Sequence, residues 1–424
     1  MSNSGAPVTP VSAAPATGSA TEAPDGASYA NAFTRRAGAV GSPPLHYGNP
    51  LGEQKALAAG TAIVDLSDRA VLTLTGPDRL TWLDSLTTQS LTHLAPGESS
   101  ETLLLDPTGH LEHAMRVIDD GVTTWLLVDG PQAGTLLAWL DRMRFMLRVE
   151  VADRTADFAT IGTLGQPALP AAAPNGVPLV WADPWANVAP GGHQYSNPAQ
   201  HPADGWTYRE VLVARDPASA EATGSANTAR QSASSEAPTD RLASFPAAGS
   251  LALEALRIAA WRPRQSTEAD EKTIPHELDW LRSAVHLNKG CYRGQETVAK
   301  VHNLGHPPRR LVMLHLDGSD GVLPVAGDPV SLPREEDAAH DTAEDAADEA
   351  ADETTIGHIT SAALHYELGP IALAVIKRKI DPDTDLVVVT DGIRMAAAQE
   401  VIVPTDAGAE ANVPRLPRLG AVHR

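Results

Sequence analysis

Apolar residues in the first three quarters of the chain alternate between strand-like and helix-like spacing. Residues 71–75 alternate as a half-buried strand does, and the Gly-Pro-Asp turn at 76–78 leads into a helix whose leucines share one face. The run 103–105 predicts a buried strand, and the Asp-Pro-Thr-Gly sequence at 106–109 predicts a tight turn after it. Further strands are predicted at 115–118, 125–128, 148–151, 158–164 and 206–214, with helices around 136–143 and over 251–261. Strands and hairpins interleaved with helices are typical of an α+β fold.

The pattern changes after residue 306, where short apolar runs follow one another without strong helices between them. These runs lie at 311–316, 329–332, 356–361, 371–376, 386–389 and 396–403. A succession of short strands indicates a small antiparallel β-barrel. The predicted fold class is therefore α+β, with a mixed domain over 46–305 and a barrel domain over 306–405.

Four stretches of biased composition interrupt this plan. Residues 1–45 are rich in Ala, Pro, Ser, Thr and Gly, and we predict a disordered tail there. An Ala/Ser/Thr-rich insert at about 216–248 and an acidic loop at about 334–355 are predicted to be solvated excursions from the two domains. Residues 406–424 form a second predicted tail.

The net charge of −21 argues against nucleic acid or an anionic membrane as a main partner. Ten of the acidic residues fall between 335 and 353, so the remainder of the chain is only moderately acidic. Residues 1–29 lack the basic start and the apolar run of a secretory signal, and no segment approaches the roughly 20 apolar residues of a membrane span. We therefore expect a cytoplasmic protein.

The single cysteine, Cys291, lies in the polar sequence Lys-Gly-Cys-Tyr-Arg-Gly-Gln-Glu at 289–296. One cysteine cannot form an internal disulfide, which fits a reducing compartment, and it cannot hold a four-cysteine cluster alone. Positive charge on both sides favours the thiolate, the reactive form of the side chain. A buried, inert cysteine is the alternative. The candidate catalytic residues are Cys291, Lys289, Arg293 and Glu296, and the motif is completed by Gly290, Tyr292, Gly294 and Gln295.

This octapeptide resembles the signature of the YgfZ family, folate-binding relatives of the glycine-cleavage T-protein that are linked to iron–sulfur cluster assembly. The Thr-Gly-Pro-Asp turn at 75–78 is similar to a turn near the start of the T-protein relatives, and the resemblance spans roughly residues 60–405. It implies a T-protein-like folate-binding domain followed by the barrel. It also implies tetrahydrofolate or another folate as cofactor, and iron–sulfur client or assembly proteins as partners.

A folate site needs a flat apolar slot for the pterin ring and positive charge for the glutamyl tail. Trp82, Trp261, Trp280 and Tyr292 are candidates for the slot, and Arg257, Arg262 and Arg264 for the tail. The alternative is that these tryptophans fill the core and these arginines only meet solvent. Three histidines, at 276, 302 and 306, flank the cysteine loop without the spacing of a known metal site, so no metal is predicted.

Two departures from the T-protein pattern bear on chemistry. Matching the hairpin turn places His113, with Glu112 beside it, where the aminomethyl-transferring relatives have an Asp. Matching the stretch 257–261 to the Arg-Ile-Glu-Ala-Gly of their later helix places Ala259 where they have a Glu that touches the pterin. The first change argues against aminomethyl transfer, and the second removes a pterin contact. Whether the chain is an enzyme stays open at this point. The residues proposed to contact folate are Tyr292, Arg257, Trp261, His113 and Glu112.

Three hypotheses follow from these residues. The first is a folate-binding accessory protein for iron–sulfur cluster assembly or repair that uses Cys291. The second is a tetrahydrofolate-dependent aminomethyl- or methyltransferase, for which Glu112 or His113 would serve as acid or base. The third is a binding scaffold without chemistry.

Overall fold

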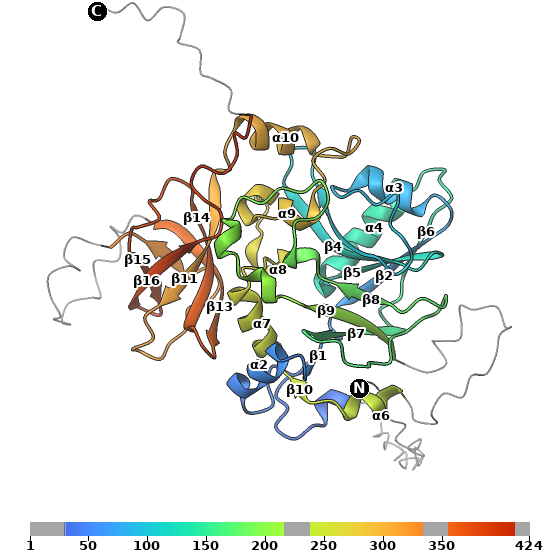
Figure 1. The fold of residues 1–424 in the computed structure, drawn as a ribbon, viewed down its shortest axis with the longest axis horizontal. Helices are drawn as coiled ribbons and strands as arrows, with labels where there is room; N and C mark the ends of the chain where they lie inside the picture. Colours follow the sequence, from blue (N-terminus) through green and yellow to red (C-terminus); the bar gives the residue numbers. More distant parts are fainter. Residues whose placement is uncertain (1–28, 30, 216–237, 334–354, 412–424) are drawn as a thin grey trace, which may run out of the picture.

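Three β-sheets form the described part of the protein, which comprises residue 29 and residues 31–215, 238–333 and 355–411 of a computed structural model. Two sheets are open and five-stranded, and the third is a closed six-stranded barrel. In Figure 1 the barrel lies on the left and the open sheets on the right, with α7, α8 and α9 between them. These helices span Ser250–Ala259, Gln265–Glu268 and Leu281–Ala284.

The first open sheet has the order β3-β4-β5-β2-β6, and every pair in it is antiparallel. Its strands are β2 Ala70–Thr75, β3 Ser99–Leu105, β4 Leu111–Asp119, β5 Thr123–Val128 and β6 Glu150–Asp153. Helices α3 (Arg79–Leu86) and α4 (Ala133–Met143) pack on one face through a core that includes Leu104. Leu103 and Leu105 belong to a second core on the opposite face. A strand buried on both faces reads as a continuous apolar run, which explains the three successive leucines.

The second open sheet has the order β10-β1-β7-β9-β8, in which only the β1–β10 pair is parallel. Its strands are β1 Ile63–Asp65, β7 Phe158–Thr163, β8 Val180–Ala182, β9 Arg209–Ala214 and β10 Ala247–Ala248. Helices α2 (Pro50–Ala58) and α7 pack beside it. Short 3₁₀ turns complete this part of the chain at Gly130–Gln132, Pro184–Ala186, Pro198–Gln200, Pro202–Gly205 and, as η5, Pro275–Leu278.

The barrel has the order β11-β14-β13-β12-β15-β16 and closes by pairing β16 with β11. Its strands are β11 Arg309–Leu316, β12 Pro329–Ser331, β13 Thr355–His365, β14 Gly369–Lys377, β15 Leu386–Thr390 and β16 Ile393–Val401. Val312 and Leu314 face the barrel interior, whereas Leu311 and Met313 join the core of the body. The outward-facing side of β11 packs against η5, and β13 and β14 pack against α7. The predicted barrel and the α+β class are confirmed.

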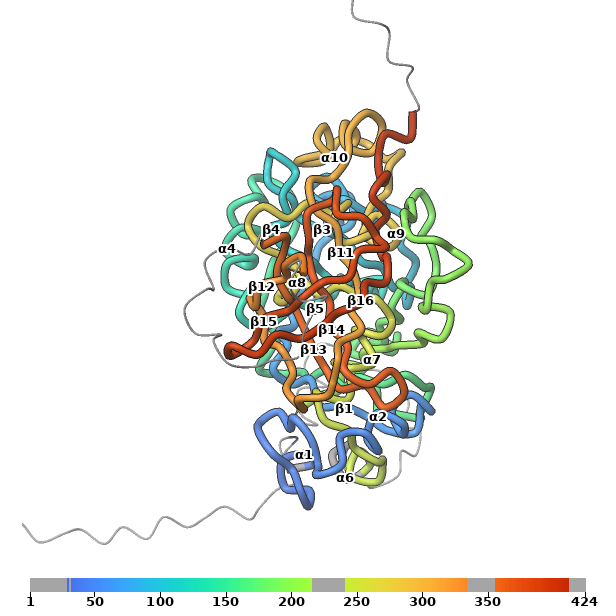
Figure 2. Tube along the Cα trace, turned by 90° about the vertical axis from the view of Figure 1, so that its left-hand side faces the viewer, coloured from blue at the N-terminus to red at the C-terminus, as the bar shows by residue number. Residues whose placement is uncertain are grey.

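Two regions predicted to lack structure are ordered in part. Residues 31–45 begin with α1 (Asn31–Thr34), and residues 238–248 contain α6 (Pro238–Ala243) and β10. Arg36 donates to the carbonyls of Leu242 and Phe245, and Phe33 is fully buried. Figure 2 shows α1 and α6 at one end of the molecule and α10 (Gln295–Leu304) at the other. The predictions for 1–28, 216–237, 334–354 and 412–424 lie outside the described residues.

No helix of the described residues is both long enough and apolar enough to span a membrane.

Candidate functional site

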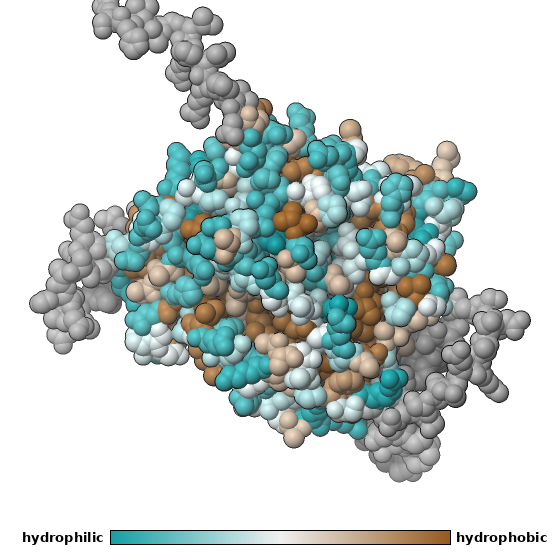
Figure 3. Space-filling model, in the orientation of Figure 1, coloured by the Kyte–Doolittle hydropathy of each residue, from teal (hydrophilic) through white to brown (hydrophobic). Residues whose placement is uncertain are grey.

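A cavity of about 570 Å³ opens where the two sheets meet the start of α7 and the chain just after it. Among the described residues, five arginines line it: Arg69, Arg116, Arg257, Arg262 and Arg264. Six carboxylate residues line it as well: Asp65, Asp68, Glu101, Asp129, Asp183 and Glu254. Figure 3 shows apolar residues gathered across the lower middle of this face, over α7, within a mostly polar surface. A cavity of this volume fits a small organic ligand.

Arg262 lies between two carboxylates of the cavity wall. Its Nη2 donates to Glu101 at 2.5 Å and its Nε to Asp183 at 3.0 Å, and all three side chains are buried. Burial alone lowers the pKa of Arg262, but Asp183 and Glu101 more than offset this and raise it above its usual value. The guanidinium is therefore a fixed positive charge in the wall.

Some polar atoms of the lining residues have no partner within the described chain. They are Nη1 of Arg262, Nε1 of Trp280 and Nε of Arg264. All three atoms are hydrogen-bond donors, and leaving a buried donor unpaired costs about 1–3 kcal/mol. A bound molecule that brings acceptors into the cavity would recover this cost.

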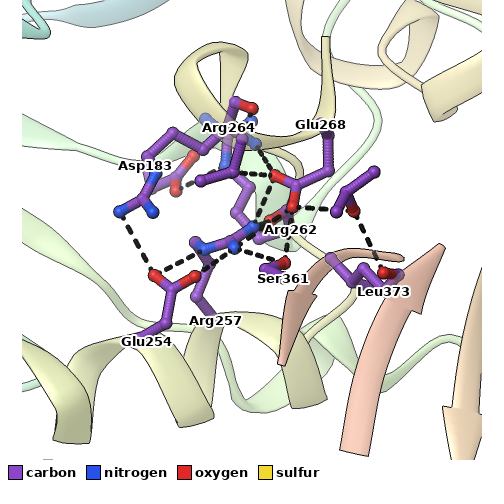
Figure 4. A network of polar contacts seen from close by, with 10 residues as sticks. Asp183, Glu254, Arg257, Arg262, Arg264, Glu268, Ser361 and Leu373 are labelled. Atoms are coloured by element: carbon purple, nitrogen blue, oxygen red, sulfur yellow. Dashed lines mark hydrogen bonds and ion pairs between the residues drawn. The ribbon is translucent and has the colours of Figure 1, made fainter. Parts of the chain in front are cut away.

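Arg257 joins the cavity to the barrel, as Figure 4 shows. Its guanidinium contacts Glu254 on α7, Glu268 on α8 and the hydroxyl of Ser361 on β13. Burial raises the pKa of Glu254, but Arg257 and Arg264 overcome this and lower it to about 2. This network ties two successive helices to a barrel strand about one hundred residues further along the chain.

The Cys291 loop begins after α9 and ends at Gly294, the N-cap of α10, and the sulfur-bearing residue is exposed. Gly294 has φ 83°, and a Cβ there would come within 2.7 Å of the Asp106 carbonyl oxygen. Gly109, at the tip of the β3–β4 hairpin, packs as closely against Thr297 of α10. Glycine is required at 294 by both conformation and space.

Lys289 is directed away from solvent and onto the end of α3. Its Nζ donates to the carbonyls of Asp84, Thr87 and Gln89 and lies 3.3 Å from an oxygen of the Asp84 carboxylate. Burial lowers the pKa of Lys289, and Asp84 opposes this. The ammonium is therefore engaged with four oxygen atoms, and it caps α3 in the way that a cation stabilises a helix C-terminus.

Arg293 forms a two-pronged ion pair with Glu112, at 2.7 and 3.2 Å, and lies over the ring of Trp139. The β3–β4 pairing skips Glu112, because Leu104 pairs with His113 and Leu105 with Leu111. Such a bulge re-aims one side chain of a strand. Here the Glu112 carboxylate reaches the loop.

The rest of the motif is placed around this pair. Tyr292 is buried, with Lys289 over its ring, and burial raises its pKa above the usual value. Gln295 donates to the Lys289 carbonyl at 3.3 Å, which closes the loop on itself. Glu296 and Gly290 are exposed, and Glu296 lies in the first turn of α10.

The cavity and the Cys291 loop are separate places. None of the described residues that line the cavity comes from 289–296. Of the five predicted folate contacts only Arg257 lines the cavity; the others, Tyr292, Trp261, His113 and Glu112, do not. Arg262, Arg264 and Trp280 line it, whereas Trp82 lies on α3 and packs into the core of the first sheet. Ala259, at the end of α7, does not line the cavity either.

His113 and Trp261 lie beside the cavity wall rather than in it. Burial lowers the pKa of His113 to about 4, so its imidazole is neutral near pH 7. Trp261 is buried at φ 58°, and its ring lies edge-on to His201. The neighbouring amide of Ala114, which does line the cavity, donates to the side chain of Gln265.

The sequence reasoning missed several charged residues of the cavity. Arg116 is one of them, and it alternates with the buried Met115 and Val117 along β4. An arginine that alternates with apolar residues is expected from the sequence to face solvent, so the pattern carries no signal of its place in the cavity. Burial and the neighbouring Arg69 lower the pKa of Arg116 to about 10, so it stays charged near pH 7.

The three histidines that flank the loop each form a hydrogen bond with a residue other than Cys291. His276 is fully buried with its Nε2 near the Val298 carbonyl, His302 bonds Tyr195, and His306 bonds the Ala407 carbonyl. Within the described ranges, no three His, Cys, Asp or Glu side chains are arranged to hold a metal ion.

Two buried histidines are expected to make stability fall on the acid side. Burial lowers the pKa of His201 and of His276 to about 3 each. The unfolded chain binds these protons near pH 6.5 and the folded chain does not, so stability is lost as pH falls through this window. We expect a loss of about 1 kcal/mol per histidine between pH 7.5 and 5.5, measured from urea midpoints.

The buried carboxyl group of Asp279 changes the pH dependence of stability in the direction opposite to that of the two histidines. Burial raises its pKa to about 6, so the folded chain binds its proton more tightly, and this contribution grows as pH falls below about 6. The replacement of His276 by glutamine should flatten the acid slope. If the urea midpoint of the parent protein did not change between pH 7.5 and 5.5, this would contradict the prediction that His201 and His276 have a lowered pKa in the folded chain.

The fold is that of the glycine-cleavage aminomethyltransferases. The solved structure of the glycine cleavage system aminomethyltransferase T from Bartonella henselae superposes with a TM-score of 0.62, covering 88% of this chain and 95% of that protein. The two sequences are 16% identical, so the likeness concerns the fold.

A curated relative is similar over a short stretch. It is a chloroplastic protein of Arabidopsis thaliana whose name describes it as a transferase. The two sequences are 39% identical over 72 residues. The match spans 16% of this chain and 16% of the plant protein. No protein-family model matches the chain.

Proposed function

We propose that this protein binds a folate in the 570 Å³ cavity and acts as an accessory protein in the assembly or repair of iron–sulfur enzymes. The observation that carries folate binding is the row of unpartnered donors on Arg262, Trp280 and Arg264 inside an aminomethyltransferase fold. Folates carry oxygen acceptors at both ends, so the chemistry of the donor set fits the ligand. The accessory role is supported by the resemblance of the motif at 289–296 to the YgfZ signature and by the exposure of Cys291.

Each wall of the cavity would have its own task in holding the folate. Arg257 and Arg264 would meet the carboxylates of the glutamyl tail, since guanidinium groups match carboxylates with two hydrogen bonds. Asp65 and Asp68, which line the cavity, would supply acceptors for the pterin's N–H groups in place of the Glu that the T-protein relatives have at the position of Ala259. Bound tetrahydrofolate supplies a carrier for one-carbon units, and the residues of this chain bind and orient it.

Titration calorimetry with tetrahydrofolate tests the binding step. We expect one site per chain with micromolar affinity or better, because the donors recover several kcal/mol when they are paired. Arg264→Met is expected to weaken binding by roughly tenfold, while Arg154→Met, a surface arginine paired with Asp157, should leave it unchanged. No heat of binding up to millimolar ligand would remove the folate from the proposal.

In the accessory role, the Cys291 sulfur would be a nucleophile or a passing ligand for iron–sulfur cargo. Glu296 and Gln295 would orient the partner, and Lys289 and Arg293 would hold the loop in shape through Asp84 and Glu112. A deletion strain is expected to lose activity of some iron–sulfur enzymes, and the Cys291→Ala protein to restore it poorly. Full restoration by Cys291→Ala would take the thiol out of the mechanism.

Cys291 is predicted to react with iodoacetamide in the native protein, because it is exposed. Cys291→Ala should melt within about 1 °C of the parent, since an exposed side chain contributes little packing. Intact-mass analysis of labelled native and urea-unfolded protein checks the first point. Labelling that requires urea would place the sulfur inside the fold. A native rate no faster than that of a free thiol would favour a loop that only docks partners.

A tetrahydrofolate-dependent aminomethyl- or methyltransferase is the second candidate, favoured by the name of the Arabidopsis relative. In this chain Glu112 is paired with Arg293 and neither Glu112 nor His113 lines the cavity. Turnover of small amines with tetrahydrofolate that is abolished by changing both residues would promote this function. Absence of turnover across a panel of amines would leave the accessory role.

A further inference from the structure

Two hydrogen-bond donors of the cavity wall around Arg262 have no partner in the described chain. Glu101 already accepts from Arg262 and from the hydroxyl of Ser283, and Asp183 accepts from Arg262 and from the indole of Trp206. The donors on Arg262 Nη1 and Trp280 Nε1 remain unpaired. A ligand group that meets them must therefore bring an oxygen acceptor.

These two donors belong to the most enclosed side chains of the wall. The Arg262 side chain is 6% exposed and Trp280 is 1% exposed, whereas the Arg264 side chain is 29% exposed. The Arg262 guanidinium also lies over the Trp280 ring, at 5.8 Å from its centroid. The guanidinium of Arg262 and the indole of Trp280 thus lie together in a strongly buried part of the wall, where a flat ring system fits better than a charged, hydrated tail.

We infer that Arg262 and Trp280 are specificity-determining residues that bind the oxo group at carbon 4 of a pterin ring. This inference rests on the proposed folate binding and deepens it. A 4-amino analogue places an N–H donor where the wall already has two donors. The donors of Arg262 and Trp280 and the 4-amino group of the ligand would then all lack an acceptor. The protein therefore discriminates between 4-oxo and 4-amino ligands.

Calorimetry on the full chain with tetrahydrofolate and its 4-amino counterpart, tetrahydroaminopterin, tests this directly. The two ligands differ only in the group at carbon 4 and the accompanying ring tautomer. We expect the 4-amino ligand to bind roughly tenfold or more weakly. Equal affinities would overturn the inference and leave the proposed function standing, whereas failure of both ligands to bind would sink the proposed function itself.

Trp280→Phe removes one donor and keeps an aromatic ring. It is expected to weaken tetrahydrofolate binding by roughly threefold or more and to leave the 4-amino ligand unchanged, which narrows the ratio of the two dissociation constants. Trp125→Phe is the matched control, because Trp125 is equally buried, donates to Asp120 and does not line the cavity. Both affinities should keep their parent values in that variant.

An arm with 6-methyltetrahydropterin, which lacks the whole aminobenzoylglutamate tail and every carboxylate, separates the two oxygen sources of a folate. The effect of Trp280→Phe should persist with this ligand. Its disappearance would assign the donor to a tail carboxylate and overturn the inference.

Discussion

The Arg262→Met protein is expected to lose about 3–5 kcal/mol of its free energy of unfolding and its affinity for folate together. The substitution leaves Glu101 and Asp183 buried without their cation, and a buried charge that loses its partner is strongly destabilising. The midpoint of urea unfolding measures the first effect and calorimetry the second. A loss of under 1 kcal/mol would mean that this side of the cavity is open to water.

A triple variant identifies the cause. Arg262→Met combined with Glu101→Gln and Asp183→Asn removes both uncompensated charges and should recover more than half of the lost stability. Folate binding should stay lost, since the amides do not restore the donor of Arg262. Arg264→Met serves as the comparison, because this arginine lines the same cavity but its side chain is partly exposed. Its cost in stability should stay below about 1 kcal/mol.

Arg257→Met is expected to destabilise the protein by a similar amount, about 3–5 kcal/mol, and to loosen the barrel from the body. The change strands Glu254 and Glu268 and removes the bond to Ser361. Scanning calorimetry should show a lower and broader transition as the barrel and body begin to melt separately. One sharp transition at the parent temperature would show that apolar packing alone holds the barrel in place.

The control for this variant is Arg154→Met. Arg154 pairs with Asp157 at the same three-residue spacing as Arg257 and Glu254, but in a partly exposed position. Exposed ion pairs contribute about 0–1 kcal/mol. A comparable loss in both variants would indicate a general effect of removing an arginine.

The barrel could be predicted in detail because its strands alternate between an inner and an outer apolar face. Each of the predicted runs became one strand of the closed sheet. By contrast, the order in 31–45 could not be predicted, since local composition there resembles a linker. It depends on Phe33 and on bonds from Arg36 to carbonyls some two hundred positions away. The hydrophobic pattern of a segment indicates its own secondary structure. Contacts between segments far apart in the sequence leave no periodic signal in either segment.

The candidate site shows the same limit. The Cys291 loop could be singled out from its residues, yet adjacency in sequence misassigned the surroundings of Lys289. Its ammonium group contacts the end of α3, and the oxygen atoms that it contacts belong to residues about two hundred positions earlier in the sequence. Likewise, Glu112 was grouped with the folate contacts, but a strand bulge directs its carboxylate to Arg293. A one-residue bulge reverses the face of a side chain without any mark in the hydrophobic pattern.

The side-chain amide of Gln265 pairs with the backbone of the bulged strand β4. Its amide nitrogen donates to the Glu112 carbonyl at 2.6 Å, and its amide oxygen accepts from the Ala114 nitrogen at 2.5 Å, as the backbone of an adjoining strand would. The same glutamine lines the cavity, and the same Glu112 grips Arg293 beside the cysteine. One neutral amide therefore connects the cavity wall to the strand residue that holds Arg293 in the cysteine loop. Glutamate at 265 would replace the donor with a charged acceptor, which repels the Glu112 carbonyl oxygen.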